Sequence, residues 1–88
     1  MQRKYRKADI ESYTTDDNLT IVLMDSDVYI LDTIATIIYN SCMGVSLNEI
    51  VARVQEQCIQ LPDLQTLQKD IANALSEMIE KKLLIYNE

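Results

Sequence analysis

The sequence predicts an α+β domain of winged-helix-like architecture, in which a three-stranded antiparallel β-sheet is followed by three α-helices. The first observation is a change of apolar period within residues 28–39. Up to Leu31 the run has the character of a short strand, whereas from Thr33 onward its apolar residues recur at helical spacing. Two further strand-like runs precede this junction, and two further amphipathic segments follow it. A sheet packed on a helical layer buries the apolar faces of all these elements.

The strands are predicted from alternation and from the turn formers between them. Residues 10–14 alternate apolar and polar side chains, residues 19–24 are more apolar, and residues 28–31 form the third run. Residues 15–18 and 25–27 contain only Thr, Asp, Asn and Ser, which favour turns. Turns this short cannot hold a parallel crossover, so we expect an antiparallel meander.

The first predicted helix runs from about Thr33 to Ser41. Asp32 or Thr33 can cap its first turn, because either side chain can accept a hydrogen bond from a free backbone N–H. Gly44 is the only glycine and suits a left-handed helix terminus, so the helix is expected to stop near it.

Two more helices follow. Ser46 and Glu49 have the spacing of a capping box and predict a helix start at residue 47. Pro62 marks the approach to the longest helix, expected over about residues 64–81, whose apolar residues recur at spacings of three and four. Residues 83–86 form an apolar tail that is expected to lie back on the sheet.

Charge divides the chain into a basic arm and an acidic body. The 88 residues carry 14 acidic and 8 basic groups, a net charge of −6. Four of the basic groups lie in residues 3–7, so residues 8–88 hold 4 basic and 14 acidic groups, a net of −10. We therefore expect a flexible basic arm over residues 1–9 and a single domain over residues 10–88. An acidic body disfavours nucleic acid as a partner, since phosphate binding depends on Lys and Arg.

The residue types exclude several classes of chemistry. Histidine is absent, and Cys42 and Cys58 stand 16 positions apart without a CxxC pair, so no zinc site is expected. No nucleophile stands beside a base, so we expect no catalytic residue, no cofactor and no enzymatic activity. No apolar run approaches the length of a membrane span, and we expect a cytoplasmic protein without membrane contact.

The order of these motifs resembles the family of the pyrroloquinoline quinone biosynthesis protein D, also called the RiPP recognition element. RiPPs are ribosomally made, post-translationally modified peptides. The resemblance rests on four stretches that together extend over most of residues 19–85: Val22-Leu23-Met24-Asp25, Tyr29 to Ala35, Gly44 to Ile50, and Asp70-Ile71 with Leu75, Met78 and Leu83-Leu84. The family usually has asparagine in place of Asp32, often Trp in place of Tyr39, and glycine in place of Lys82.

The resemblance implies a protein that binds the leader segment of a precursor peptide and presents it to a leader protease, a cyclase or a radical SAM modifying enzyme. The chain is similar in length to the small leader-binding proteins of lasso-peptide pathways. In the family, the leader lies as an added strand in the groove between the third strand and the third helix. The peptide-binding residues implied here are Val28, Tyr29, Ile30, Leu31, Leu67, Asp70, Ile71, Ala74 and Met78.

Two other interpretations are open at this stage. A winged-helix transcription regulator would require a third helix that is basic on its outer side, whereas Asp70, Glu77 and Glu80 stand there against Lys69, Lys81 and Lys82. A protein-interaction scaffold would require only exposed apolar surface. Because residues 28–31 are expected to form an edge strand, the protein is either a monomer or a strand-swapped dimer.

Overall fold

The computed structural model describes residues 4–24, 27–58 and 60–87. In chain order its elements are β1 (Lys4–Lys7), β2 (Glu11–Thr14), β3 (Thr20–Met24), β4 (Asp27–Leu31), α1 (Thr33–Ser41), β5 (Met43–Val45), α2 (Leu47–Gln57), α3 (Leu64–Glu80) and β6 (Leu84–Asn87). The three helices and the β2-β3-β4 antiparallel meander are confirmed, each within about two residues of its expected bounds. The domain is thus a mixed α+β fold.

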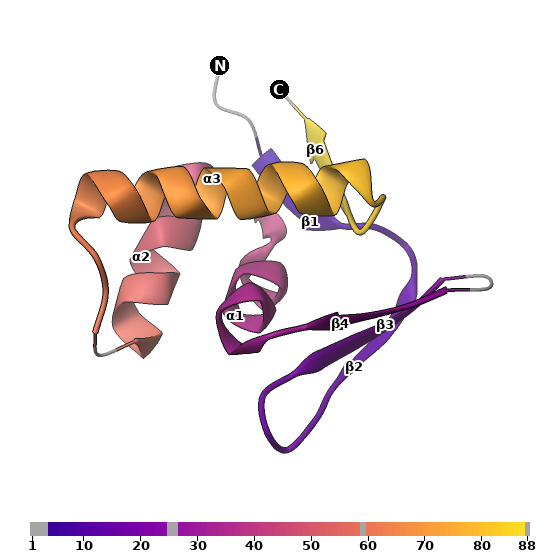
Figure 1. Ribbon diagram of the computed structural model, residues 1–88. Helices are drawn as coiled ribbons and strands as arrows, with labels where there is room; N and C mark the ends of the chain where they lie inside the picture. The colour runs from indigo at the N-terminus through magenta and orange to yellow at the C-terminus, as the bar shows by residue number, and fades with distance from the viewer. Residues whose placement is uncertain (1–3, 25–26, 59, 88) are drawn as a thin grey trace.

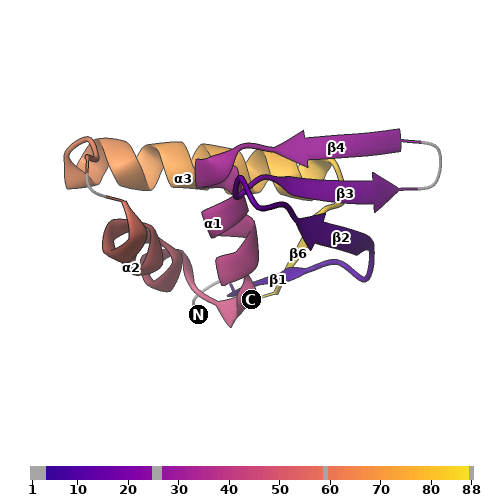
Figure 2. The same ribbon diagram turned by 90° about the horizontal axis from the view of Figure 1, so that it is seen from below.

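The strands form two sheets where the sequence predicted one. One three-stranded sheet has the order β2-β3-β4, and a second has the order β5-β1-β6. All pairs in both sheets are antiparallel. Figures 1 and 2 show α3 lying across the molecule, with the β3–β4 hairpin extending away from the helices.

The expected flexible arm over residues 1–9 contains the central strand of the second sheet. Lys4 and Arg6 are exposed, whereas Tyr5 and Lys7 are half-buried, which is the alternation of a strand with one covered face. Tyr5 packs against the core and lies 6.1 Å from the Tyr86 ring, between centroids. The density of positive charge concealed this alternation in the sequence. Residues 1–3 of the expected arm lie outside the described residues.

The apolar tail pairs with this same strand. β6 runs antiparallel to β1, from Lys4 opposite Asn87 to Lys7 opposite Leu84. Leu83 and Leu84 are buried in the core. The tail therefore lies on β1, and it does not pair with the β2-β3-β4 sheet.

Gly44 does not end α1 as expected. Cys42 caps that helix, with φ −81° and its backbone N–H donating to the Tyr39 carbonyl. Gly44 has φ +79° inside β5, where the register to β1 shifts by one residue. Glycine adopts positive φ without a steric penalty, so here it forms a bulge and not a helix terminus.

The helix starts follow the local signals. Asp32 Oδ1 accepts from the Ala35 N–H at 2.8 Å, and Ser46 Oγ accepts from the Glu49 N–H at 3.4 Å. At the start of α3 the Thr66 hydroxyl donates to Asp63 Oδ1 at 2.6 Å, and this hydrogen bond lowers the pKa of the Asp63 carboxyl.

The core lies where the helices meet the inner faces of both sheets. Its most completely buried side chains come from β3, all three helices and the turn after α3: Val22, Ile38, Tyr39, Ile50, Val54, Ile71, Leu75 and Leu83. A buried hydrogen bond of 2.9 Å from the Thr20 hydroxyl to the Thr36 hydroxyl joins β3 to α1. The Thr36 hydroxyl donates to the Leu31 carbonyl at 3.3 Å, which fixes the end of β4 against α1.

Candidate functional site

β4 is an edge strand, because among the described strands it pairs with β3 alone. An edge strand presents unpaired backbone N–H and C=O groups on its outer side. It runs from Asp27 to Leu31 and leads directly into the capped first turn of α1. The start of α1 therefore holds one end of this edge in place.

The register shows which residues of β4 offer free backbone groups. The Thr15 N–H donates to the Leu19 carbonyl at 2.8 Å, which makes this pair a hydrogen-bonded one. Hydrogen-bonded pairs alternate along an antiparallel ladder, so the backbone groups of Ile21 and Leu23 face β2. Those of Thr20, Val22 and Met24 face β4. Their partners on β4 are Leu31, Tyr29 and Asp27. The backbone groups of Val28 and Ile30 therefore point away from β3, toward the free edge.

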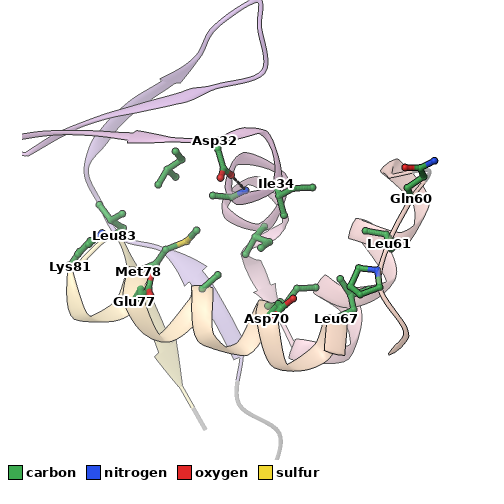
Figure 3. Close-up of a pocket in the computed structure, with 16 residues that line it drawn as sticks. Asp32, Ile34, Gln60, Leu61, Leu67, Asp70, Glu77, Met78, Lys81 and Leu83 are labelled. Carbon is green, nitrogen blue, oxygen red and sulfur yellow. Dashed lines mark hydrogen bonds between the residues drawn. The ribbon is translucent and has the colours of Figure 1, made fainter. Parts of the chain in front are cut away.

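A groove of about 450 Å³ lies between α1 and α3, next to the end of β4. Figure 3 shows Met78 extending from α3 toward α1, with Gln60 and Leu61 beside Leu67 at one end of the groove and Lys81 and Leu83 at the other. α3 contributes six lining residues, Leu67, Asp70, Ile71, Ala74, Glu77 and Met78, and its C-cap residue Lys81 adds a seventh. The opposite wall consists of Leu31, Asp32, Ile34, Ala35 and Ile38.

The floor of the groove is part of the core. Leu67, Ile71 and Met78 are at most 4 % exposed, so their main role is packing, and only small parts of their surfaces face the groove. Ala74 is partly exposed between them. A short side chain at this position leaves space above the floor that a larger residue would fill.

The charges at the rim of the groove are mostly negative. Asp32, Asp70 and Glu77 line it against the single cation of Lys81, and all four residues are exposed. The Lys81 ammonium lies 5.7 Å from the centre of the Tyr29 ring, within the range of a cation–π interaction. An apolar floor below an acidic rim suits a ligand with apolar side chains and basic neighbours.

The structure brings together six of the nine residues expected to bind peptide. Leu31, Leu67, Asp70, Ile71, Ala74 and Met78 line the groove. Tyr29 is half-buried next to Lys81 but outside the lining. The side chains of Val28 and Ile30 are 61 % and 67 % exposed on the other face of the sheet, so these two residues can reach a groove ligand only through their backbone.

Sequence reasoning missed two walls of the groove. Residues 60–62 close one end of the groove, although Pro62 was interpreted only as the approach to the longest helix. Ile34, Ala35 and Ile38 share one helical face. Their spacing predicted an apolar face on this helix, but it did not show which part of the molecule that face lines. Glu77 and Lys81 follow Asp70 and Ala74 at helical spacing, which was the signal that could have placed them in the lining.

Other features do not suggest a reactive centre. Among the described residues, no group of three or more Cys, Asp or Glu side chains could hold a metal ion. Burial raises the pKa of the Cys42 thiol to about 12, against a smaller lowering effect of Lys7, so this thiol is protonated at neutral pH. A second hollow, of about 420 Å³, is lined mainly by hydroxyl and amide side chains and adjoins α1, α2 and the β2–β3 turn instead of the free edge of β4.

Comparison with known families decides the classification. The family model of coenzyme PQQ synthesis protein D (PqqD) matches residues 20–84. The chain belongs to the PqqD family. The matched span of this PqqD-family protein runs from the start of β3 to the start of β6, and it contains β4, α3 and all nine residues expected to bind peptide.

The membership confirms the resemblance drawn from the sequence motifs. No curated protein and no solved structure matches this PqqD-family protein. In the described part of the chain, no helix has both the length and the apolar character needed to cross a bilayer.

Proposed function

We propose that this protein binds the leader segment of a ribosomally made precursor peptide and presents it to a processing or modifying enzyme. The leader adds as a fourth strand to β4, with its inward-facing side chains in the groove against α3. The observation that carries the proposal is the position of this groove. It adjoins β4, the edge strand of the β2-β3-β4 sheet that leads into α1. Membership of the PqqD family supports a role in peptide recognition.

Strand addition would use both parts of the site, the free backbone edge of β4 and the apolar groove beside it. Backbone hydrogen bonds at Val28 and Ile30 fix the register of the peptide and supply part of the affinity. Apolar contacts with the floor, above all at Ala74 and Met78, supply selectivity, and methionine adapts to side chains of different shape. Asp70 serves as a polar anchor at the rim, for a basic leader side chain or for a backbone amide.

The protein acts as an adaptor without catalytic residues or a cofactor of its own. Its partners are the precursor peptide and one enzyme, either a leader protease, a cyclase or a radical SAM enzyme, as in lasso-peptide and related natural-product pathways. The complex forms in the cytoplasm, where precursor peptides are made. The winged-helix-like arrangement and the choice between a monomer and a strand-swapped dimer stay predictions.

Proline substitutions along β4 test this docking mode. The probe is a fluorescein-labelled synthetic peptide with the sequence of a candidate leader segment. Val28→Pro and Ile30→Pro remove an N–H that faces the free edge, so we expect little loss of thermal stability and no measurable peptide binding in fluorescence polarisation. Tyr29→Pro removes an N–H that faces β3, and we expect it to destabilise the domain by about 3 kcal/mol.

A matched control separates the effect of losing the backbone N–H from the effect of changing the side chain. Ile30→Thr keeps the N–H and a β-branched side chain, so its affinity should stay within a few-fold of the wild type. Each variant is melted in parallel with its binding assay. Normal peptide binding by folded Val28→Pro and Ile30→Pro variants would show that the peptide docks elsewhere.

A further inference from the structure

The outer face of the β2-β3-β4 sheet is mostly apolar, with Glu11 as its one charged strand residue, and its exposed apolar side chains do not pack on the core. Tyr13, Leu23, Val28 and Ile30 are between 38 % and 67 % exposed, and none of them belongs to the core or packs against it. Monomeric proteins rarely leave such contiguous apolar surface without a function.

Register places these side chains in rows across the sheet. Tyr13 lies opposite Ile21, which lies opposite Ile30, and Leu23 lies opposite Val28 in the next row. Both rows end at β4, whose outer edge is free. Val28 and Ile30 are the most exposed apolar residues of the β2-β3-β4 sheet, because each lacks a neighbour on one side.

An added strand continues these rows. Residues that lie directly opposite each other in an antiparallel pair have their side chains on the same face of the sheet, about 5 Å apart. The backbone groups that face the free edge belong to Val28 and Ile30. A leader residue bonded to Ile30 therefore has its side chain on the outer face, and so does the leader residue two positions away, beside Val28.

We infer that the outer face of β4 selects leader residues at a spacing of two, through contacts of their side chains with Ile30 and Val28. The inference rests on the proposed strand addition and adds a second set of specificity contacts to it. Alternate leader residues are selected by the groove, and the residues between them by the outer face. Both sets are apolar in the wild-type protein, with β-branched or aromatic residues favoured on the outer face.

Peptide display tests this inference with random sequences, so the natural leader is not needed. A library of random peptides is selected against the immobilised full-length protein and against its Ile30→Lys and Val28→Lys variants. We expect Ile30→Lys to change one consensus position from apolar to Asp or Glu, and Val28→Lys to make the same change two positions away. With synthetic peptides, each matched pair should gain about two- to fivefold over the mismatched pair.

Tyr13→Lys is the matched control. Tyr13 is 54 % exposed on the same face but lies two strands away from the free edge, so its substitution should leave the consensus unchanged. Ile30→Glu is a second variant, with Lys or Arg expected at the position that Ile30→Lys makes acidic. Thermal melts accompany every variant, and these exposed positions should tolerate the change.

The outcomes separate this inference from the proposed function. If the wild-type protein enriches no peptide, both fail. If it enriches a consensus that Ile30→Lys, Ile30→Glu and Val28→Lys leave unchanged, strand addition stands and outer-face selection is overturned. If Tyr13→Lys also changed one of these consensus positions to an acidic residue, outer-face selection would be overturned as well. The cause of the change would then be general charge instead of a cross-strand contact.

Discussion

At Lys82 the backbone adopts φ +66° to end α3. Its N–H donates to the Ile79 carbonyl at 2.9 Å, and the next N–H, of Leu83, donates to the Met78 carbonyl at 2.8 Å. This pair of hydrogen bonds is the Schellman motif, which usually has glycine at the left-handed position. The turn also directs Leu83 into the core and β6 onto β1. A lysine here retains the geometry at a conformational cost.

Lys82→Gly is therefore expected to stabilise the domain by about 1 kcal/mol, because glycine adopts positive φ without a Cβ clash. In a domain of this size the gain corresponds to a rise of roughly 4–8 °C in the melting temperature. The control is Lys82→Ala, which removes the charge and keeps Cβ, and it should not stabilise. An equal gain from both variants would assign the effect to charge.

Residues whose role is local could be predicted from the sequence, whereas residues with two possible roles could not. The cap at Ser46, and Asp32 as one of two candidate caps of α1, were identified because the donor and acceptor lie within three residues of each other. Gly44 was assigned to a helix end because positive φ serves helix termini and bulges alike. Only its pairing with β1, about 40 residues away, distinguishes the two.

At the scale of elements, β1 is the feature that the sequence least revealed. It is four residues long, and its partners β5 and β6 lie far along the chain, so no local period showed the pairing. β3, β4 and α3 were predicted because each carries its own apolar period. The same distinction holds for the site: its edge strand and helical stripe follow from periodicity, but the wall formed by residues 60–62 follows from tertiary packing.

Removal of residues 1–7 tests whether β1 is part of the stable domain. The deletion leaves β5 and β6 without their common neighbour and uncovers the core beside Tyr5. We expect the melting temperature to fall by more than about 10 °C, equivalent to a loss of roughly 2 kcal/mol or more. Thermal unfolding followed by circular dichroism measures the change.

The control keeps the strand and removes its exposed charge. Lys4 and Arg6 are exposed, so the double substitution Lys4→Ser, Arg6→Ser should leave stability within about 1 kcal/mol of the wild type. If the deletion variant melts together with the wild type, residues 4–7 contribute no stability and the flexible-arm prediction stands.

At the scale of the whole molecule, the positive and negative charges occupy different regions. The exposed cations of β1 lie on the second sheet, while Asp32, Asp70 and Glu77 surround the groove. Residues 8–88 carry 4 basic and 14 acidic groups, a net of −10, which repels a phosphate backbone and attracts a basic peptide. We therefore expect a leader whose apolar residues are flanked by Lys or Arg.

The salt dependence of leader binding measures how much of the affinity comes from this charge. The acidic rim residues are exposed, so salt screens their attraction to the leader, and the Debye length falls from about 10 Å at 0.1 M to about 3 Å at 1 M. In the proposed docking mode, backbone pairing at β4 and apolar contacts with the groove floor are weakly screened. We expect a Kd between roughly 10 nM and 10 μM, weakened only several-fold between about 0.05 and 0.5 M salt.

The measurement is a salt titration by fluorescence polarisation, with duplex DNA as a comparison ligand that should show no binding at moderate salt. A loss of several hundred-fold in leader affinity would mean that charge at the rim, and not strand addition over an apolar floor, recognises the peptide.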